Sequence, residues 1–226
     1  MKIAVIGTGA VGRALAGRLS GLGHQVFMGT RNVEETIQRE GASGIRDWLV
    51  TQDRVTLQTF NEAVRSGDEL IVFAMNGKAA LDSLSMVDAA LLKKKVMIDI
   101  SNPLDFSQGF PPSLTVCNTE SLAEQIQTAY PALKVVKTLN TMSHPIMVNP
   151  DLLEGDHVVF MSGNEESAKG QVAGLLMSFG WKTHTIIDLG DLSTARGTEM
   201  MLPLWVRLYG KWQTAMFNFA VNRSLS

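Results

Sequence analysis

The stretch KIAVIGTGAVG, residues 2–12, decides the fold of this 226-residue chain. A β-branched apolar run ends in glycine and leads directly into AVGRALAGRLSGLG, whose apolar residues recur at helical spacing. Placed between a strand and a helix, G-x-G-x-x-G is the pattern in which a tight turn brings backbone N–H groups to a pyrophosphate. The pattern predicts a dinucleotide-binding loop formed by Gly7, Thr8, Gly9, Ala10, Val11 and Gly12.

Segments typical of strands and helices alternate along the rest of the chain. Apolar runs predict strands at residues 2–7, 24–29, 55–58, 69–75, 95–101, 133–140, 157–163 and 182–190. Helical spacing predicts helices at residues 10–23, 33–41, 59–67, 77–94, 121–130, 164–180 and 196–223, with an irregular segment at 42–54 and a long connector at 141–156. Thr59 with Glu62, and Ser121 with Glu124, match the capping box, and Asn164 is the expected cap of helix 164–180.

This alternation predicts an α/β fold of the Rossmann type, with a doubly wound, mainly parallel sheet and helices on both faces. A small extension of strands and a helix is expected at the C-terminal end. We expect one domain over residues 1–226, in which residues 1–140 form the dinucleotide-binding core and residues 141–226 pack on it.

Composition narrows the function classes. The net charge of −2 gives no basic field for nucleic acid or anionic membranes, and the apolar runs are far shorter than the roughly 20 residues of a membrane span. The single cysteine, Cys117, excludes an intrachain disulfide and a cysteine-based metal cage, and no signal peptide is recognisable. We therefore expect a cytoplasmic protein with a small-molecule substrate, no metal site, and no nucleic-acid or membrane partner.

Thr30, Arg31 and Asn32 follow the second predicted strand, where an NAD-binding fold places an acidic residue for the ribose hydroxyls. A guanidinium at this position favours a 2′-phosphate, because it can donate two hydrogen bonds to one phosphate. Two charge-assisted bonds, each contributing about 1.5–3 kcal/mol, would favour NADP over NAD by about a hundredfold or more. The sequence therefore predicts an NADP(H) site.

Three other strand ends are expected at the same edge of the sheet, because ligands of open parallel sheets lie beyond the carboxyl ends of the strands. These ends are rich in Ser, Thr and Asn, which suit neutral hydrogen bonds to a ribose and a carboxamide. The expected cofactor-binding residues there are Ala74, Met75, Asn76, Ser101, Asn102, Leu139, Asn140 and Thr141.

His144 is the one histidine near these strand ends, and it is a candidate acid or base. A loop histidine followed by a turn proline is the commoner explanation, so no residue is assigned as catalytic. The C-terminal segment carries Trp205, Trp212 and Phe219 at helical spacing, which suggests a homodimer contact; a monomeric mass in solution would exclude it.

The chain resembles the deazaflavin-dependent NADP oxidoreductases, which pass hydride between NADP(H) and coenzyme F-420. The resemblance rests on KIAVIGTGAVGRALAGRLSGLGHQV, GTRN, DISNPL, VVKTLNT and RGTEMMLPLWVRL, in that order. It extends to the N-terminal reductase domain of six-transmembrane metalloreductases. The resemblance implies that Thr30, Arg31 and Asn32 bind the 2′-phosphate, and that the loops at 74–76 and 139–141 hold the ribose and nicotinamide. It also implies that two flat rings are aligned without an acid or base.

Three functions remain open from the residues. The first is hydride transfer from NADPH to F-420 or another flavin-like acceptor. The second is reduction of a small imine or carbonyl compound, for which His144 would be the proton donor. The third is a non-catalytic NADPH sensor. Turnover of NADPH with different acceptors distinguishes among them.

Overall fold

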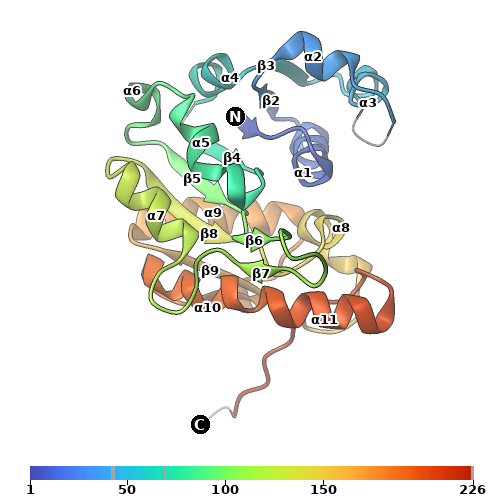
Figure 1. Ribbon diagram of the computed structural model, residues 1–226, viewed down its shortest axis with the longest axis vertical. Coiled ribbons are helices and arrows are strands. Elements are labelled where there is room, and N and C mark those ends of the chain that lie inside the picture. Colours follow the sequence, from blue (N-terminus) through green and yellow to red (C-terminus); the bar gives the residue numbers. More distant parts are fainter. Residues whose placement is uncertain (42–43, 69, 225–226) are drawn as a thin grey trace.

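The computed structural model describes residues 1–41, 44–68 and 70–224. Among these residues, eight strands form one sheet in the order β10-β9-β8-β5-β4-β1-β2-β3 (Figure 1). The strands are β1 (Lys2–Ile6), β2 (Gln25–Thr30), β3 (Val55–Thr59), β4 (Leu70–Phe73), β5 (Val96–Asp99), β8 (Lys134–Thr138), β9 (Val159–Gly163) and β10 (Ile186–Asp188). The predicted Rossmann-type α/β fold is confirmed.

Strand direction explains where a ligand can lie. The strands from β3 through β1 to β8 are parallel to their neighbours, whereas β9 runs antiparallel to β8, and β10 runs parallel to β9. The order reverses between β1 and β4, so the loops after these two strands diverge and leave a crevice at their carboxyl ends. This crevice is the switch point at which open α/β sheets bind ligands.

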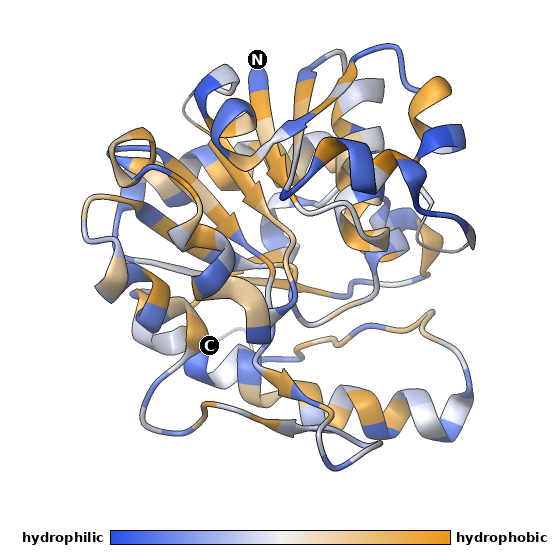
Figure 2. Ribbon diagram, turned by 45° about the horizontal axis from the view of Figure 1, so that its top comes forward, coloured by the Kyte–Doolittle hydropathy of each residue, from blue (hydrophilic) through white to orange (hydrophobic). Residues whose placement is uncertain are grey.

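Helices cover both faces of the sheet. They are α1 (Ala10–Gly21), α2 (Val33–Gln38), α3 (Arg46–Val50), α4 (Phe60–Ser66), α5 (Ala80–Ser85), α6 (Ala89–Leu92), α7 (Leu122–Ala129), α8 (His144–Val148), α9 (Glu166–Phe179), α10 (Ala195–Met200) and α11 (Leu202–Trp212). Each face of the sheet has its own hydrophobic core. In one core, alternate strand residues pack against α1, α8 and α9; in the other, the intervening strand residues pack against α4, α5 and α7. Several strands are accordingly hydrophobic along most of their length (Figure 2).

Within β1 the two cores are separated residue by residue. Ile3 and Val5 belong to the core under α1, whereas Ala4 and Ile6 belong to the core under α4. Successive side chains of a strand point to opposite faces, so a strand covered on both sides must be apolar at every position. This is why the run at residues 2–6 is continuous rather than alternating.

The expected single helix at 77–94 is wrong. A short 3₁₀ turn (Gly77–Ala79) precedes α5, which ends at Ser85, and α6 begins after Asp88. The Asp88 carboxylate accepts from Ala90 N at 2.9 Å, and Asp88 N donates to Asn61 Oδ1 at 2.8 Å. A short acidic side chain that caps the next turn competes with continuation of the helix.

Other boundaries also differ from the expectations. Asn164 does not cap α9: its Oδ1 accepts from Leu192 N at 2.9 Å, and Glu165 holds the cap position. The connector at 141–156 contains α8, and the loop between β5 and α7 contains an antiparallel pair, β6 (Leu104–Asp105) and β7 (Ser113–Leu114). The strand expected at 182–190 is regular only in β10, after a 3₁₀ turn. Residues 42, 43 and 69, which fall in predicted segments, lie outside the described residues.

The predicted C-terminal helix is shorter than expected. It is divided into α10 and α11 and ends at Trp212, because the next residue, Gln213, has a left-handed φ of 54°. Phe219 therefore lies in the tail rather than on the helix, where its carbonyl accepts from Val158 N at 2.9 Å. Phe217 of the tail stacks on Trp205 with ring centroids 5.2 Å apart. A homodimer through this helix stays a prediction, and its contact would rest on exposed Trp212 and its neighbours.

No helix among the described residues combines the length and the apolar character that crossing a membrane requires. Both predicted capping boxes are present, at Thr59 with Glu62 and at Ser121 with Glu124.

We predict that Thr59→Ala lowers the free energy of unfolding by about 1 kcal/mol, because α4 loses its N-cap. The Thr59 hydroxyl accepts from Glu62 N at 3.4 Å and donates to Glu62 Oε2 at 2.7 Å. Urea denaturation followed by circular dichroism measures the change. Thr59→Ser keeps the hydroxyl and should stay within about 0.5 kcal/mol of the wild type; an equal loss in both variants would contradict the role of the cap.

Candidate functional site

The glycine loop joins β1 to α1 at the switch point. Gly7 has a φ of 118°, and a Cβ at this position would lie 2.5 Å from the carbonyl oxygen of Ala74. A Cβ on Gly12 would lie 2.1 Å from the carbonyl oxygen of Gly7. The protein's own packing therefore requires both glycines: Gly7 lets the loop pack against the end of β4, and Gly12 lets α1 pack against the loop.

Gly9 differs from the other two glycines. A Cβ built on it meets no atom within 4 Å, so the protein itself does not require glycine here. Gly9 is also the N-cap residue of α1 and provides no side chain to cap the first turn. The open space beside a helix N-terminus fits the pyrophosphate of a dinucleotide, which backbone N–H groups would bind.

A cleft of about 200 Å³ connects this loop to two other strand ends. It brings together many of the residues predicted from the sequence: Gly7, Thr8, Gly9, Thr30, Arg31, Ala74, Met75 and Asn76. Gly29, Arg39 and Phe60 also line it, and they were not among the predicted site residues. Arg39 directly follows α2, and only its positive charge could have indicated a phosphate-binding role.

The three polar residues of the turn after β2, Thr30, Arg31 and Asn32, have different contacts. The Thr30 hydroxyl is buried and lies 2.7 Å from the hydroxyl of Thr36. Asn32 caps α2, since its Oδ1 accepts from Glu35 N at 3.1 Å and its Nδ2 donates to Glu35 Oε1 at 3.2 Å. Thr30 and Asn32 therefore hold the turn.

Arg31 is exposed at the end of this turn, and within the described part of the chain it makes no ion pair or hydrogen bond. Its guanidinium donors are uncommitted, and the residue lines the same cleft as the glycine loop. An anion bound beside Arg31 would therefore meet a cation that no protein carboxylate neutralises.

The opposite end of the crevice is built from two asparagines. Asn102 Nδ2 donates to the carbonyl oxygen of Asn140 at 2.9 Å, and Asn140 Nδ2 donates to Asn102 Oδ1 at 2.9 Å. Gly77 approaches them so closely that a Cβ on it would lie 2.0 Å from the carbonyl oxygen of Asn102. Asn76, Asn102 and Asn140 are thus gathered from the loops after β4, β5 and β8, as the strand-end argument predicted.

Ser101, Leu139 and Thr141 are buried around this pair. Like Asn102 and Asn140 themselves, they lie outside the lining of the 200 Å³ cleft. Leu139 has a φ of 63°, a left-handed conformation that is costly for a leucine and marks a sharp change of direction at the end of β8. This turn is what aims Asn140 back toward Asn102.

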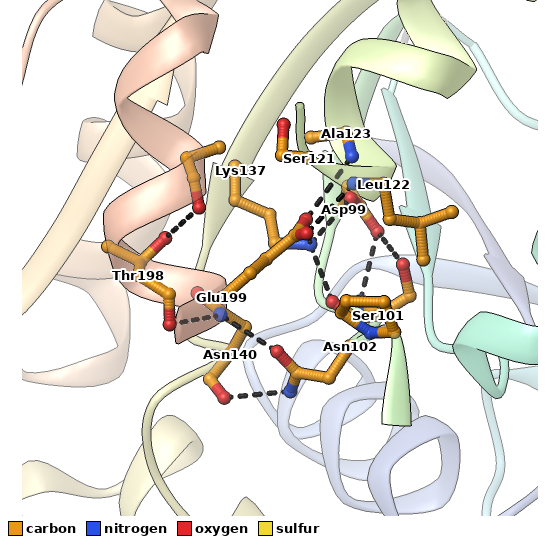
Figure 3. A network of polar contacts seen from close by, with 12 residues as sticks. Asp99, Ser101, Asn102, Ser121, Leu122, Ala123, Lys137, Asn140, Thr198 and Glu199 are labelled. Atoms are coloured by element: carbon orange, nitrogen blue, oxygen red, sulfur yellow. Dashed lines mark hydrogen bonds and ion pairs between the residues drawn. The ribbon is translucent and has the colours of Figure 1, made fainter. Parts of the chain in front are cut away.

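Beneath the asparagine pair lies a buried ionic network that the sequence did not reveal (Figure 3). The ammonium of Lys137 lies 2.9 Å from Asp99 Oδ2 and 2.7 Å from Glu199 Oε1, and all three side chains are at most 1% exposed. Burial acts to lower the pKa of Lys137, but the two carboxylates raise it above its ordinary value, so the ammonium stays charged. Burial raises the pKa of Glu199, and Lys137 opposes that shift.

The carboxylate oxygens of Glu199 and Asp99 also accept hydrogen bonds from backbone amides and from one hydroxyl. Glu199 Oε2 accepts from Leu122 N at 2.8 Å and Glu199 Oε1 accepts from Ala123 N at 3.2 Å, both in the first turn of α7. Asp99 Oδ1 accepts from the amide and hydroxyl of Ser101, at 2.9 and 2.6 Å. One ammonium between two carboxylates is thereby stabilised without solvent.

His144 begins α8, which packs against α1. It is partly buried, and both this burial and the nearby Arg13 lower its pKa, so the imidazole is neutral at pH 7. It does not line the cleft beside the glycine loop. The described residues contain no cluster of three or more His, Cys, Asp or Glu side chains arranged to hold a metal.

Comparison with known proteins adds independent information. The family model for NADP oxidoreductase, coenzyme F420-dependent, matches residues 2–103. The crystal structure of a candidate F420-dependent NADP-reductase from Arthrobacter sp. FB24 is 49% identical, with a TM-score of 0.94, and the match covers 99% of this chain and 100% of that chain.

Two other similarities are more distant. Metalloreductase STEAP3 of Rattus norvegicus is 29% identical over 209 residues, which are 90% of this chain but only 38% of that protein. The chain thus spans a little over a third of this curated relative. A reductive aminase from Aspergillus terreus, in complex with NADPH4, cyclohexanone and allyl amine, is 20% identical with a TM-score of 0.63, covering 94% of this chain and 62% of that chain. That similarity shows a shared fold.

We predict that one glycine variant weakens NADPH binding and that another lowers stability. Gly9→Ala should fold with an unchanged melting temperature but weaken NADPH binding about tenfold or more, because the methyl group occupies the approach of the phosphates. Gly12→Ala should lower stability by about 1–3 kcal/mol, because its Cβ clashes with the Gly7 carbonyl. Thermal unfolding and NADPH fluorescence titration measure the two quantities. Normal NADPH binding by Gly9→Ala would contradict the predicted site.

Proposed function

The chain belongs to the coenzyme F420-dependent NADP oxidoreductase family, and on this premise we propose that it passes hydride between NADPH and a deazaflavin or flavin-like acceptor. It is an NADP-dependent oxidoreductase, so the proposal concerns the acceptor and the residues that act. The observation that carries it is the neutral, mutually bonded Asn102–Asn140 pair at the end of the crevice opposite Arg31.

The adenosine end of NADP(H) is assigned to the turn after β2. Arg31 would bind the 2′-phosphate, while Thr30 and Asn32 keep the turn in shape through Thr36 and Glu35. The glycine loop would bind the pyrophosphate through the first N–H groups of α1. Arg39 lines the same cleft and would add a second cation at this end.

The nicotinamide end is assigned to Asn76, Asn102 and Asn140. Bound NADPH supplies the hydride, and transfer between two flat rings depends mainly on their distance and orientation. The amides at this end can hydrogen-bond a carboxamide and a ribose without exchanging protons at neutral pH. Such a set of groups suits an acceptor that takes hydride at a ring carbon without general acid catalysis.

A second candidate is reduction of a small imine or carbonyl compound, the substrate class that the Aspergillus aminase binds in its crystal structure. This reaction needs a proton donor, and His144 is the candidate. Its lowered pKa leaves little imidazolium at neutral pH, which weakens this alternative. Metal reduction, implied by the name of the STEAP3 relative, is tested by the same acceptor panel.

We predict that Arg31→Leu lowers kcat/KM for NADPH about a hundredfold and leaves that for NADH within about twofold, because only NADPH carries the 2′-phosphate. Steady-state kinetics with both cofactors measure the ratio. Arg65→Leu, an exposed arginine in the last turn of α4, is the matched control and should change neither value. A wild type that prefers NADH would rule out the assignment.

We predict that the wild type oxidises NADPH with F-420 or free flavins faster than with imines, ketoacids or ferric chelates. His144→Ala should retain ring-to-ring hydride transfer, whereas an acid-catalysed reaction would lose about a hundredfold or more. Absorbance at 340 nm follows every acceptor except where the acceptor itself absorbs, and product analysis covers those cases. Turnover of imines alone, lost in His144→Ala, would favour the second candidate instead.

A further inference from the structure

One ammonium holds together three chain segments that are far apart in the sequence. Lys137, near the end of β8, binds Asp99 at the end of β5 and Glu199 in α10, and it also donates to the carbonyl oxygen of Ser101 at 2.5 Å. Figure 3 shows these side chains converging from two strands and a helix.

The residues of the ionic network lie close in the sequence to the residues of the asparagine pair and to Thr198, which binds it. Ser101 precedes Asn102, and Asn140 follows Lys137 by three residues. Thr198 precedes Glu199, and its carbonyl oxygen accepts from Asn140 Nδ2 at 3.2 Å. The ionic network and the amide pair are therefore joined at three points.

The contacts of Asn140 determine what it presents to a ligand. Its Nδ2 donates both to Asn102 Oδ1 and to the carbonyl oxygen of Thr198, so a flipped amide would lose both bonds. Its Oδ1 receives no hydrogen bond from the described residues, although the residue is only 3% exposed. A fixed and unpartnered acceptor suits the N–H₂ group of a carboxamide.

We propose that Lys137 is the positioning residue of the nicotinamide end: with Asp99 and Glu199 it fixes Asn102 and Asn140 so that Asn140 Oδ1 receives the carboxamide. The inference rests on the proposed NADP(H) site. It also gives α10 a part in that site, since Thr198 and Glu199 complete an arrangement begun by β5 and β8.

Stability alone does not explain such a network. Removing three charged groups from water costs free energy, and neutral or apolar replacements of a whole buried ion cluster are often neutral or stabilising. A role in fixing geometry accounts for the cluster better, because one ammonium with fixed donors sets the relative position of three loops.

The test uses two ligands that differ in length. The compound 2′,5′-ADP reaches only the adenosine end, whereas NADPH also reaches the asparagine pair. The variant Asp99→Asn/Lys137→Met/Glu199→Gln removes all three charges together while keeping an acceptor for Ser101 and for one of the two α7 amides, Leu122 N or Ala123 N. We expect its Kd for 2′,5′-ADP to stay within about twofold of the wild type and its Kd for NADPH to rise about tenfold or more, with loss of the enhanced nicotinamide fluorescence.

A matched control is present in the chain. Lys169 is 3% exposed and also lies between two carboxylates, 2.7 Å from Glu166 Oε1 and 2.8 Å from Asp188 Oδ2, but it has no bond to the asparagine pair. Lys169→Met should lower the melting temperature and leave the ratio of the two dissociation constants unchanged.

Several outcomes decide the matter. A folded triple variant with a wild-type ratio, or with both affinities reduced in parallel, overturns the proposal. If the triple variant does not fold, Glu199→Gln leaves Lys137 and Asp99 as a balanced pair, and an unchanged ratio in this variant overturns it as well. A wild type that binds neither ligand would instead refute the NADP(H) site itself.

Discussion

The buried ammonium of Lys137 is the interaction on which this end of the molecule depends. It lies within 2.9 Å of Asp99 and Glu199 and bonds the carbonyl oxygen of Ser101, so it attaches α10 to the two strands whose ends form the crevice. Removing the ammonium alone would leave two buried carboxylates uncompensated, at a cost of about 3–5 kcal/mol. The C-terminal segment is therefore bound to the sheet by charge as well as by apolar contact.

Much of the fold could be predicted because its signals are local. The apolar run at residues 2–6, the glycines after it and the two capping boxes each act within a few residues. The failures involve competition from side chains. Asp88, expected inside a single helix, caps α6 instead. Asn164, expected to cap α9, accepts from the backbone of Leu192, which lies far along the chain.

The position of the candidate site could be predicted from the sequence, but the role of each polar residue in it could be predicted less well. Parallel strands deliver their carboxyl ends to one edge, which places the loops containing Asn76, Asn102 and Asn140 together. Residue type alone could not show that the Thr30 hydroxyl is hydrogen-bonded to that of Thr36, whereas the guanidinium of Arg31 has no partner among the described residues. Lys137 and Glu199 were missed because a lysine within an apolar strand shows its partners only when the chain is folded.

The place of Glu199 in the chain has a consequence for synthesis on the ribosome. Lys137 emerges about sixty residues before it and Asp99 about one hundred; at about 5–20 residues per second, the interval after Lys137 corresponds to roughly 3–12 seconds. During this interval the N–H groups of Leu122 and Ala123 lack the carboxylate that they bind in the finished protein. The sheet around β1 can form early, whereas the crevice acquires its final shape only when α10 has been synthesised. Cofactor capture is thereby tied to the arrival of Glu199.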